Sequence, residues 1–285
     1  MLIAGASVNT IKNVWCAIED RHRMFGHRPP LWAPGAFRRR LKALASIQGA
    51  PTRLVFPIGV HHVQAMLRLI GLTPKERRNV ILVVSGTVMC ARVSEPTRVQ
   101  TCDVHWGVDA CFDAQYEEGI GIKIRKGKTD TGRRGLMTRV PPSTLQRRMR
   151  EYAIEQGLHV HPRCTKSNHP GAKCPFCPPF FPKVLLRAPP SAPTDGPNTR
   201  VGMTRQNVTA AVKYVVAMLG VDARHYSGLS MRRGGLTAAV NARVPEPILF
   251  LQSGHGQTKA ARRYMAPDDP HLLYETGKAV LGLRG

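Results

Sequence analysis

The sequence predicts a mainly α-helical protein with one small antiparallel β-sheet, in which a short N-terminal part precedes a larger C-terminal part. Apolar residues recur at helical spacing over most of the 285 residues. Short alternating stretches separated by glycines are confined to residues 104–140. The 42% content of hydrophobic residues is enough for one large core or two modest ones. We therefore expect one or two folded domains.

The N-terminal part, residues 1–50, is expected to hold two short helices. Ser7 and Gly26 are start and stop signals around the first, whose apolar face contains Val8, Ile11, Trp15 and Ile18. A proline-rich joint follows, and the second helix, over residues 37–47, carries three consecutive arginines. Two short helices do not supply a core of their own, so this part is predicted to be an incomplete domain.

The C-terminal part, residues 51–285, is expected to begin with two or three helices. The sheet follows, with turns marked by Gly119, Gly121, Gly127 and Gly132. Helices are predicted again over residues 142–156 and from residue 204, where one apolar face contains Val208, Val212, Val215, Val216 and Leu219. Residues 159–199, between these helices, are rich in Cys, His and Pro and predict a looped insertion.

The charge balance points to a polyanionic partner. The chain has 42 Lys and Arg residues against 18 Asp and Glu residues, a formal net charge of +24. Such a surplus repels itself unless a polyanion neutralises it, and nucleic acid is the commonest such partner. The longest apolar run, residues 80–91, is too short to cross a bilayer, and the N-terminus lacks the basic flank of a signal peptide. We expect nucleic acid as the partner, no membrane association, and an intracellular, non-secreted protein.

Three distant segments carry groups suited to phosphoryl transfer. Arg92 and Glu95 are one helical turn apart, so the carboxylate can fix the guanidinium. Lys128 stands at the tip of a predicted hairpin. The third segment contributes Arg232, His255 and Tyr264.

Together these residue types suit attack on a DNA phosphodiester. A tyrosine phenol is a weak nucleophile, so cationic donors must stabilise the charge that develops on the phosphate oxygens. Arginine makes bidentate contacts with phosphate and stays charged at any working pH. A lysine whose pKa falls among other cations can protonate the leaving 5′ oxygen. This chemistry requires no metal and no cofactor.

The chain resembles the tyrosine recombinases, the phage-integrase type of site-specific recombinase, over about residues 57–264. The matching motifs are A-R-V-S-E, K-G-K-T-D, S-G-L-S-M-R-R-G-G, S-G-H-G and R-R-Y-M. The resemblance implies a partial core-binding domain in residues 1–50 and an integrase-type catalytic domain in residues 51–285. It also implies double-stranded DNA as the partner and assembly on it as a homo-oligomer, a tetramer, with the tail after Tyr264 docked on a neighbouring subunit.

The resemblance also implies a role for each residue. Arg92, Arg232 and His255 would hold the scissile phosphate, and Lys128 would be the general acid. Tyr264 would form a covalent 3′-phosphotyrosyl intermediate, and Glu95 matches the acidic residue that supports the site. The function implied is site-specific DNA breakage and rejoining by the integrase of a mobile element, in the nucleus of a eukaryote or the cytoplasm of a bacterium.

One position departs from the family pattern. The family motif is usually His-x-x-Arg, and here Leu229 stands three residues before Arg232. Leucine neither accepts the proton of Tyr264 nor donates to a phosphate, and His225 would compensate only if its loop folded back. Two alternatives therefore stay open: a catalytically impaired DNA-binding relic of the same fold, and a type IB topoisomerase.

A second set of residues suits a metal ion. A C-x-x-C pair, one further cysteine and one histidine are enough for a structural tetrahedral zinc site, which would comprise Cys164, His169, Cys174 and Cys177. The alternative is a proline-rich loop with ordinary thiols. The remaining cysteines lie in apolar surroundings and predict small core residues: Cys16, Cys90, Cys102 and Cys111.

One stretch of the sequence is acidic but does not indicate a metal-dependent nuclease. It has no partner carboxylates at a distance, so a solvated loop is predicted for Asp103, Asp109, Asp113, Glu117 and Glu118.

Overall fold

The structure is a computed structural model. It describes residues 8–27, 39–41, 43, 55–106, 119–124, 136–158, 160, 164, 174–183, 200–253 and 274–283. The chain divides into two compact units, Met1–Leu54 and Val55–Gly285.

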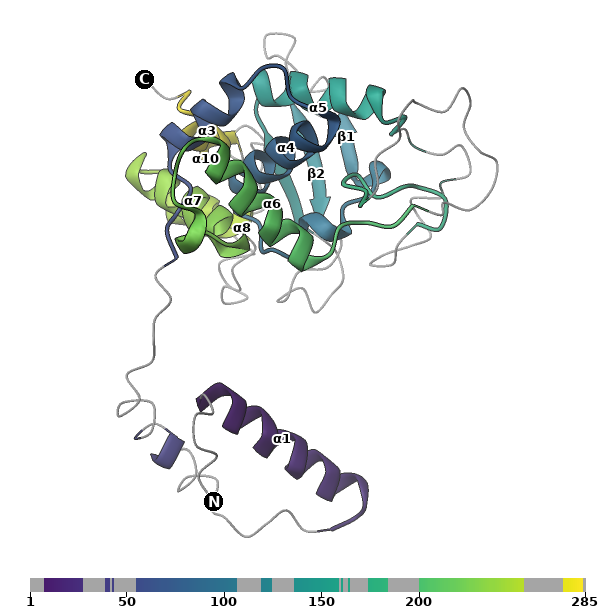
Figure 1. Ribbon diagram of the computed structural model, residues 1–285, viewed down its shortest axis with the longest axis vertical. Helices are drawn as coiled ribbons and strands as arrows, with labels where there is room; N and C mark the ends of the chain where they lie inside the picture. Colours follow the sequence, from purple (N-terminus) through teal and green to yellow (C-terminus); the bar gives the residue numbers. More distant parts are fainter. Residues whose placement is uncertain are drawn as a thin grey trace. The chain divides into compact units, whose positions relative to one another are not determined.

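The described part of the first unit consists mainly of helix α1, Val8–Met24 (Figure 1). Its last turn carries three basic residues, which suit the negative end of a helix dipole. Gly26 follows with a φ of 69°, a left-handed conformation typical of a helix stop. The predicted first helix is thus confirmed. Of the predicted second helix, residues 39–41 and 43 are helical, and the other residues lie outside those that the structure describes.

Helices form most of the described part of the second unit (Figure 1). In chain order they are α3 (Val60–Arg68), α4 (Pro74–Val88), α5 (Thr144–Glu155), α6 (Arg205–Met218), α7 (Gly228–Asn241), α8 (Glu246–Ser253) and α10 (Tyr274–Leu281), with the 3₁₀ helices η1 (Pro96–Arg98), η2 (Thr101–Asp103) and η4 (Ala223–His225). These helices confirm the predicted helical regions after residue 51. Among the described residues, no helix has the length and apolarity that a bilayer crossing requires.

Helix α4 is the centre of this unit. Its N-terminus is capped by Thr73, whose hydroxyl accepts from the backbone N–H of Glu76 and whose own N–H donates to the Glu76 carboxylate (2.9 Å). Every residue from Arg78 to Val88 is buried. Helices α3, α5, α6, α7 and α10 all contact α4. The predicted apolar face of α6 is part of this core, with buried side chains at Val208, Val212, Val215 and Val216.

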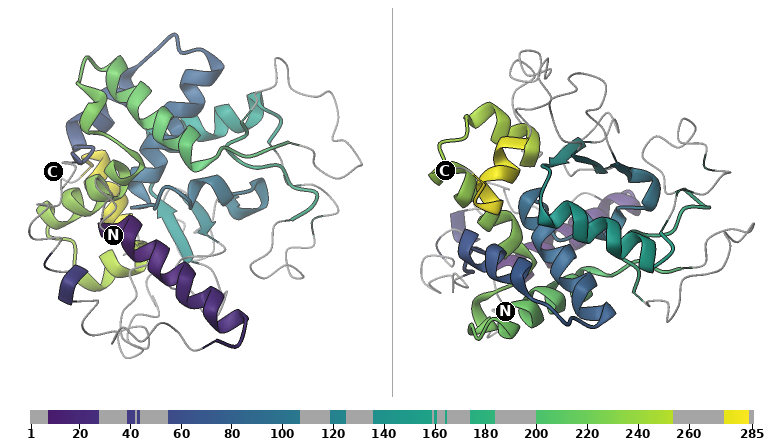
Figure 2. Two further views of the ribbon diagram at one scale, coloured as in Figure 1. Left: turned by 60° about the horizontal axis from the view of Figure 1, so that its bottom comes forward. Right: turned by 90° about the horizontal axis from the view of Figure 1, so that it is seen from above.

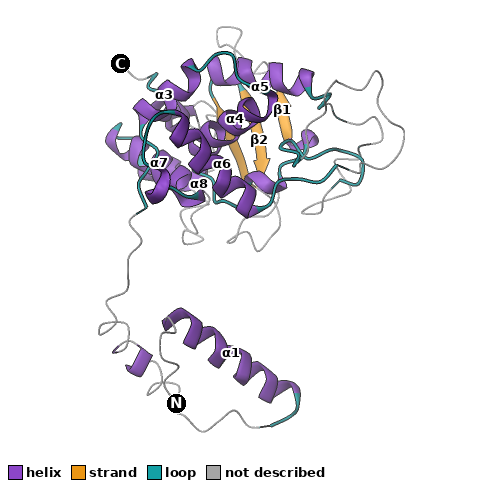
Figure 3. Cartoon of the chain, viewed as in Figure 1, coloured by secondary structure: helices purple, strands orange, loops and turns teal. Residues whose placement is uncertain are grey.

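Three short strands form one antiparallel sheet (Figure 3). They are β1 (Val104–Trp106), β2 (Ile120–Ile124) and β3 (Leu136–Val140), in the order β1-β2-β3. Ile122 of the central strand is paired with Val104 on one side and Thr138 on the other, and all three are buried. The predicted sheet is confirmed, and so is the predicted fold class.

Helix α10 packs against α7 and α3 of its own unit; it is the yellow helix in Figure 2. Tyr274, Val280 and Leu281 are buried there. A Cβ added to Gly277 would lie 2.6 Å from Cδ of Pro141, so glycine permits this close contact. In this single chain α10 thus packs within its own unit, and docking of the tail on a neighbouring subunit stays a prediction. Helix α10 is too short to build a core of its own, and it adds to the core that α3, α4 and α7 form.

Candidate functional site

Arg92 and Glu95 form an ion pair within a tight turn after α4. The backbone N–H of Glu95 donates to the carbonyl of Arg92 (2.8 Å). The Glu95 carboxylate accepts from the Arg92 backbone N–H (2.6 Å) and from its guanidinium (3.1 Å). The Glu95 side chain is only 6% exposed, and that of Arg92 is 23% exposed. The expected pairing is present, but a turn forms it and not an α-helix, because α4 ends at Val88 and Cys90 has a left-handed φ of 47°.

Arg232 of α7 is buried beside this turn. Its Nη1 donates to the carbonyl oxygen of Cys90 (3.0 Å) and to that of Ser253 (2.9 Å). Cys90 lies two residues before Arg92, and Ser253 is the last residue of α8. Arg232 therefore connects the Arg92 turn, α7 and the end of α8 at one place.

Two glycines let α4 and α7 approach closely enough for these bonds. Gly86 of α4 faces Met231, and a Cβ at Gly86 would lie 2.7 Å from the Met231 sulfur. A Cβ at Gly235 of α7 would overlap the carbonyl of Thr87 and lie 2.6 Å from Sγ of Cys90. Gly235, the second glycine of the R-R-G-G motif, therefore has a packing role. It brings the helix that carries Arg232 against the end of α4.

The site carries an excess of positive charge in poorly solvated surroundings. Burial lowers the pKa of Arg232, and the charge of Arg92 lowers it further, whereas Glu95 raises it. Burial raises the pKa of the Cys90 thiol to about 12, so this thiol is neutral near pH 7. One carboxylate beside two guanidiniums leaves a positive charge that an oxyanion would neutralise.

Leu229 occupies the first turn of α7, one turn before Arg232. Residues three apart lie on one face of a helix. The Leu229 side chain is 48% exposed, and its backbone N–H donates to the hydroxyl of the N-cap residue Ser227 (3.2 Å). The His225 ring packs against Phe56, with ring centroids 5.0 Å apart. The position that departs from the family motif is thus accessible, and His225 is engaged in an aromatic contact.

The other three predicted catalytic residues lie outside the described residues. Lys128 belongs to residues 125–135 between β2 and β3, and His255 and Tyr264 belong to residues 254–273 between α8 and α10. Ser253, whose carbonyl accepts from Arg232, directly precedes the second of these stretches. The structure brings Arg92, Glu95 and Arg232 together, and the catalytic roles of all six residues stay predictions.

A second cluster consists of thiols. The Sγ atoms of four cysteines lie within 4.8 Å of one another: Cys102, Cys164, Cys174 and Cys177. Three of them belong to the predicted zinc set, whose fourth member, His169, lies outside the described residues. Burial raises the pKa of Cys164 to about 12, with a further contribution from the neighbouring thiols. The four residues form what we call the cysteine cluster.

Sequence reasoning missed Cys102 as a member of this cluster. It is buried, as expected of a core cysteine, but its Sγ lies among the other three sulfurs. No second cysteine stands near Cys102 at C-x-x-C spacing, so the sequence holds no local signal for it. Only the pairing of two distant segments reveals it.

Asp103 corrects the interpretation of the acidic stretch at its first residue. Its carboxylate accepts from the backbone N–H of Gln100 (2.9 Å) and is buried. It thus caps η2, and the expectation of a solvated residue was wrong here. The other four acidic residues lie outside the described residues.

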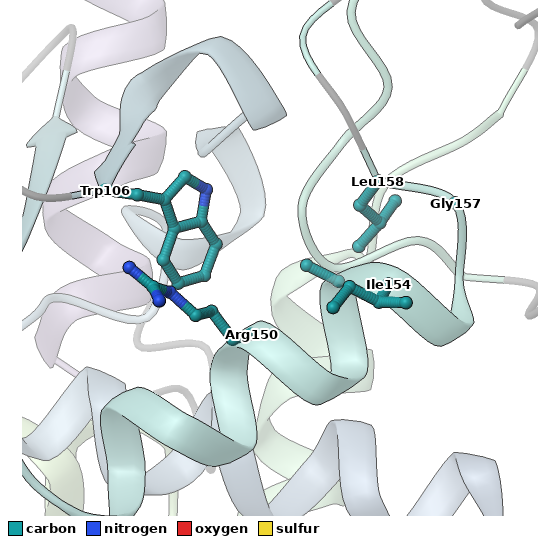
Figure 4. A pocket seen from close by; sticks show the side chains of 6 residues that line it. Trp106, Arg150, Ile154, Gly157 and Leu158 are labelled. Atoms are coloured by element: carbon teal, nitrogen blue, oxygen red, sulfur yellow. The ribbon is translucent and has the colours of Figure 1, made fainter.

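A cavity of about 390 Å³ lies beside α5 (Figure 4). Trp106, Ile154 and Leu158 line it together with Arg150, whose guanidinium carbon is 5.7 Å from the centroid of the Trp106 ring. This distance is typical of a cation–π contact. None of the described lining residues belongs to the predicted catalytic set, so this cavity is separate from the arginine site.

Comparison with known proteins gave matches among solved structures. No family model matches the chain, and no curated protein matches it in sequence. The chain is similar to the XerH site-specific recombinase bound to difH substrate in a pre-cleavage complex, with 13% identity and a TM-score of 0.44, over 74% of this chain and 50% of that chain.

Two further structures show comparable similarity. The XerH recombinase bound to palindromic difH in a post-cleavage complex matches with 14% identity and a TM-score of 0.45, over 79% of this chain and 53% of that chain. The integrase from mycobacterium phage Brujita matches with 14% identity and a TM-score of 0.46, over 97% of this chain and 78% of that chain. The matched region thus spans about half the length of the XerH chains. By their names these proteins are a site-specific recombinase and an integrase.

Proposed function

We propose that the chain is a tyrosine recombinase that breaks and rejoins DNA strands through a covalent 3′-phosphotyrosyl intermediate, as the integrase of a mobile element. The observation that carries this proposal is the convergence of Arg92, Glu95 and Arg232 from distant parts of the sequence. Arg92 is close enough to lower the pKa of Arg232. Two guanidiniums held in this way form a binding site for one phosphate.

Each described residue has a distinct task in this proposal. Arg92 and Arg232 donate hydrogen bonds to the non-bridging oxygens of the scissile phosphate, where negative charge develops during attack. Glu95 keeps the Arg92 guanidinium in one orientation through its bond at 3.1 Å. The carbonyls of Cys90 and Ser253 hold Arg232 in the same manner. The cations are thus positioned before DNA arrives, which is what preorganised catalysis requires.

The chemical step uses the three residues outside the described set. Oη of Tyr264 attacks the phosphorus, and the bond to the 5′ oxygen breaks as Lys128 donates a proton to that oxygen. His255 donates a hydrogen bond to the phosphate. Because Leu229 has no group that accepts a proton, the phenolic proton passes to His255 or to water. Rejoining is the reverse step, in which a 5′ hydroxyl of another strand attacks and Tyr264 is released.

The partner in this proposal is double-stranded DNA. A net charge of +24 supports extensive contacts with phosphates, which position a protein on DNA without reading bases. Exchange between two duplexes requires four strands to be cut. Each subunit supplies one Tyr264 and cuts one strand, so we extend the proposal to a tetramer on DNA. It acts in the nucleus of a eukaryote or in the cytoplasm of a bacterium.

Trapping of the covalent adduct tests the proposal. The substrate is a pool of duplexes with randomised sequence, each nicked so that cleavage beside the nick releases a short fragment and prevents rejoining. Wild-type protein should accumulate adducts that survive denaturing electrophoresis, whereas Tyr264→Phe should bind DNA equally well and give none. Tyr214→Phe is the matched control, because the hydroxyl of Tyr214 donates to Glu76 (2.7 Å) and has no part in the proposed reaction.

Adducts that persist in Tyr264→Phe would show that another residue attacks, which contradicts the assignment. Loss of adducts in Tyr214→Phe would show that removal of a tyrosine hydroxyl acts through stability. Supercoiled plasmid provides a further distinction, because a type IB topoisomerase would yield relaxed topoisomers without recombined products.

A second candidate function is DNA binding without cleavage. The observation that favours it is Leu229, which is exposed at the position where the family has a proton-accepting histidine. In this case wild-type protein would bind the nicked duplexes and form no adduct, and the two arginines would hold an intact phosphate.

A further inference from the structure

We propose that Cys102, Cys164, Cys174 and Cys177 bind one zinc ion in a structural site made of four thiolates. A zinc–sulfur distance of about 2.3 Å in a tetrahedron places the sulfurs about 3.8 Å apart. The sulfurs of Cys164 and Cys174 are 3.6 Å apart, and all four lie within 4.8 Å of one another. The protein alone thus places the sulfurs at the spacing of a closed zinc site.

One glutamine side chain organises the C-x-x-C turn of this cluster. Nε2 of Gln100 donates to the carbonyl of Cys174 (2.8 Å) and to that of Cys177 (2.7 Å). Its Oε1 accepts from the backbone N–H of Cys174 (2.7 Å). The residue is only 5% exposed. A buried amide that makes three bonds to one short turn acts as the outer support that metal ligands need.

Backbone pairing brings Cys102 to the same turn. The N–H of Thr101 donates to the carbonyl of Pro178 (3.0 Å), and the N–H of Phe180 donates to the carbonyl of Val99 (2.9 Å). Gln100 lies between these bonds, and Cys102 follows it by two residues. The fourth sulfur is therefore supplied by the segment that begins at the Arg92 turn, and not by the cysteine-rich insertion.

The chemistry of the cluster favours zinc and a structural role. Four soft sulfur ligands select zinc over magnesium or calcium, which prefer oxygen. A set of four protein ligands is closed and leaves no position for substrate, as in structural sites. The six cysteines that the structure describes form no disulfide. The ion would tie the insertion, residues 159–199, to the segment after Glu95, whether or not the protein cleaves DNA.

Metal analysis of the full chain tests the site. Protein purified with a reductant and without chelators should contain one zinc ion per chain. Replacement by cobalt should give the visible absorption of tetrahedral cobalt with four thiolates. Absence of zinc together with failure to bind cobalt would overturn the proposal, as would a disulfide among the four cysteines in protein freshly purified without a reductant.

Three variants identify the fourth ligand. Cys102→Ser should weaken metal binding by more than the roughly 10- to 100-fold expected for loss of an outer-shell partner. His169→Ala should retain the zinc and the four-thiolate spectrum. Cys16→Ser is the matched control, because Cys16 is exposed and lies in the other unit.

The outcome remains decisive if Cys102→Ser does not fold. A wild-type cobalt spectrum typical of three sulfurs and one nitrogen, or loss of metal in His169→Ala, would assign the fourth position to histidine and overturn the assignment of Cys102. Loss of zinc in Cys16→Ser would equally contradict a site confined to the cluster.

Discussion

The arginine site and the cysteine cluster share one segment and have opposite requirements. Residues 90–95 supply a carbonyl and an ion pair to the first, and residues 100–102 supply an amide and a thiol to the second. The first holds two guanidiniums against one carboxylate and needs an anion. The second holds four sulfurs and, as proposed, needs a cation.

The two sites also differ in what supports them. Arg232 is held where α4 packs against α7 in the main core, and glycines allow these two helices to approach closely. The cysteine cluster lies among turns and bridges, where few helices pack. A metal ion supplies folding free energy in regions that lack an apolar core of their own. Helix packing thus positions the arginine site, whereas in the proposal a metal ion performs this task for the cysteine cluster.

The largest expected effect concerns Leu229, the position at which the arginine site departs from the family. Leu229→His should raise the rate of adduct formation by about 10²- to 10⁴-fold, because general acid–base assistance is typically worth that much. The rate is measured on the nicked duplex pool. Leu229→Gln is the control, since it is polar but does not accept the phenolic proton. An equal gain in the glutamine variant would mean that polarity, and not proton transfer, is limiting.

The next effect separates the two sites. Arg232→Lys should reduce adduct formation by about 10²- to 10³-fold, as for loss of one donor to a developing oxyanion. Metal content should stay at the wild-type level. Arg233→Lys is the neighbouring control, because Arg233 is exposed and donates to the carbonyl of Val55 (2.7 Å). Loss of zinc in Arg232→Lys would show that the two sites are not structurally independent.

A smaller effect is expected from the outer support of the cluster. Gln100→Glu keeps an acceptor for the N–H of Cys174 but no longer donates to the two carbonyls, so metal affinity should fall by about 10- to 100-fold. Competition with a chromophoric chelator measures the affinity. Gln100→Ala loses all three bonds and should be at least as weak. Wild-type affinity in the glutamate variant would refute a role for the donated bonds.

The smallest effect tests the helix contact that supports the arginine site. Gly235→Ala inserts a methyl group against the Thr87 carbonyl and the Cys90 thiol, and overpacking of this kind costs about 1–3 kcal/mol of the free energy of unfolding. Denaturant unfolding of the full chain measures it. Adding Cys90→Ala should recover only part of the loss, because the carbonyl stays in place. Full recovery would locate the strain at the thiol alone.

Local features of the fold were predictable because they follow from periodicity. The apolar face of α6 and the glycine-punctuated strands β1, β2 and β3 need only a window of neighbouring residues. The spacing of Arg92 and Glu95 indicated that the two side chains pair. It did not indicate the backbone conformation, since a separation of three residues fits both a helix and a tight turn. The left-handed Cys90 decides in favour of the turn.

Non-local features escaped prediction for a physical reason. Cys102 reaches the cluster through bridges to residues 178–180, and no pattern around Cys102 encodes that pairing. Helix α10 is too short to build a core of its own, so its place in a core does not follow from its own residues. It is buried because Gly277 fits against Pro141 and Val88, which are far away in the sequence.

The buried cation Arg232 links the folding of the protein to its ligand. Keeping a guanidinium beside Arg92 with little water has an electrostatic cost in the folded state. A bound phosphate removes part of that cost, and a ligand that binds only the folded state stabilises it by about 2.7 kcal/mol at a concentration 100 times its dissociation constant. If the proposed function holds, DNA is also a thermal stabiliser of this protein, and a preparation stripped of nucleic acid should unfold at a lower temperature than one that retains it.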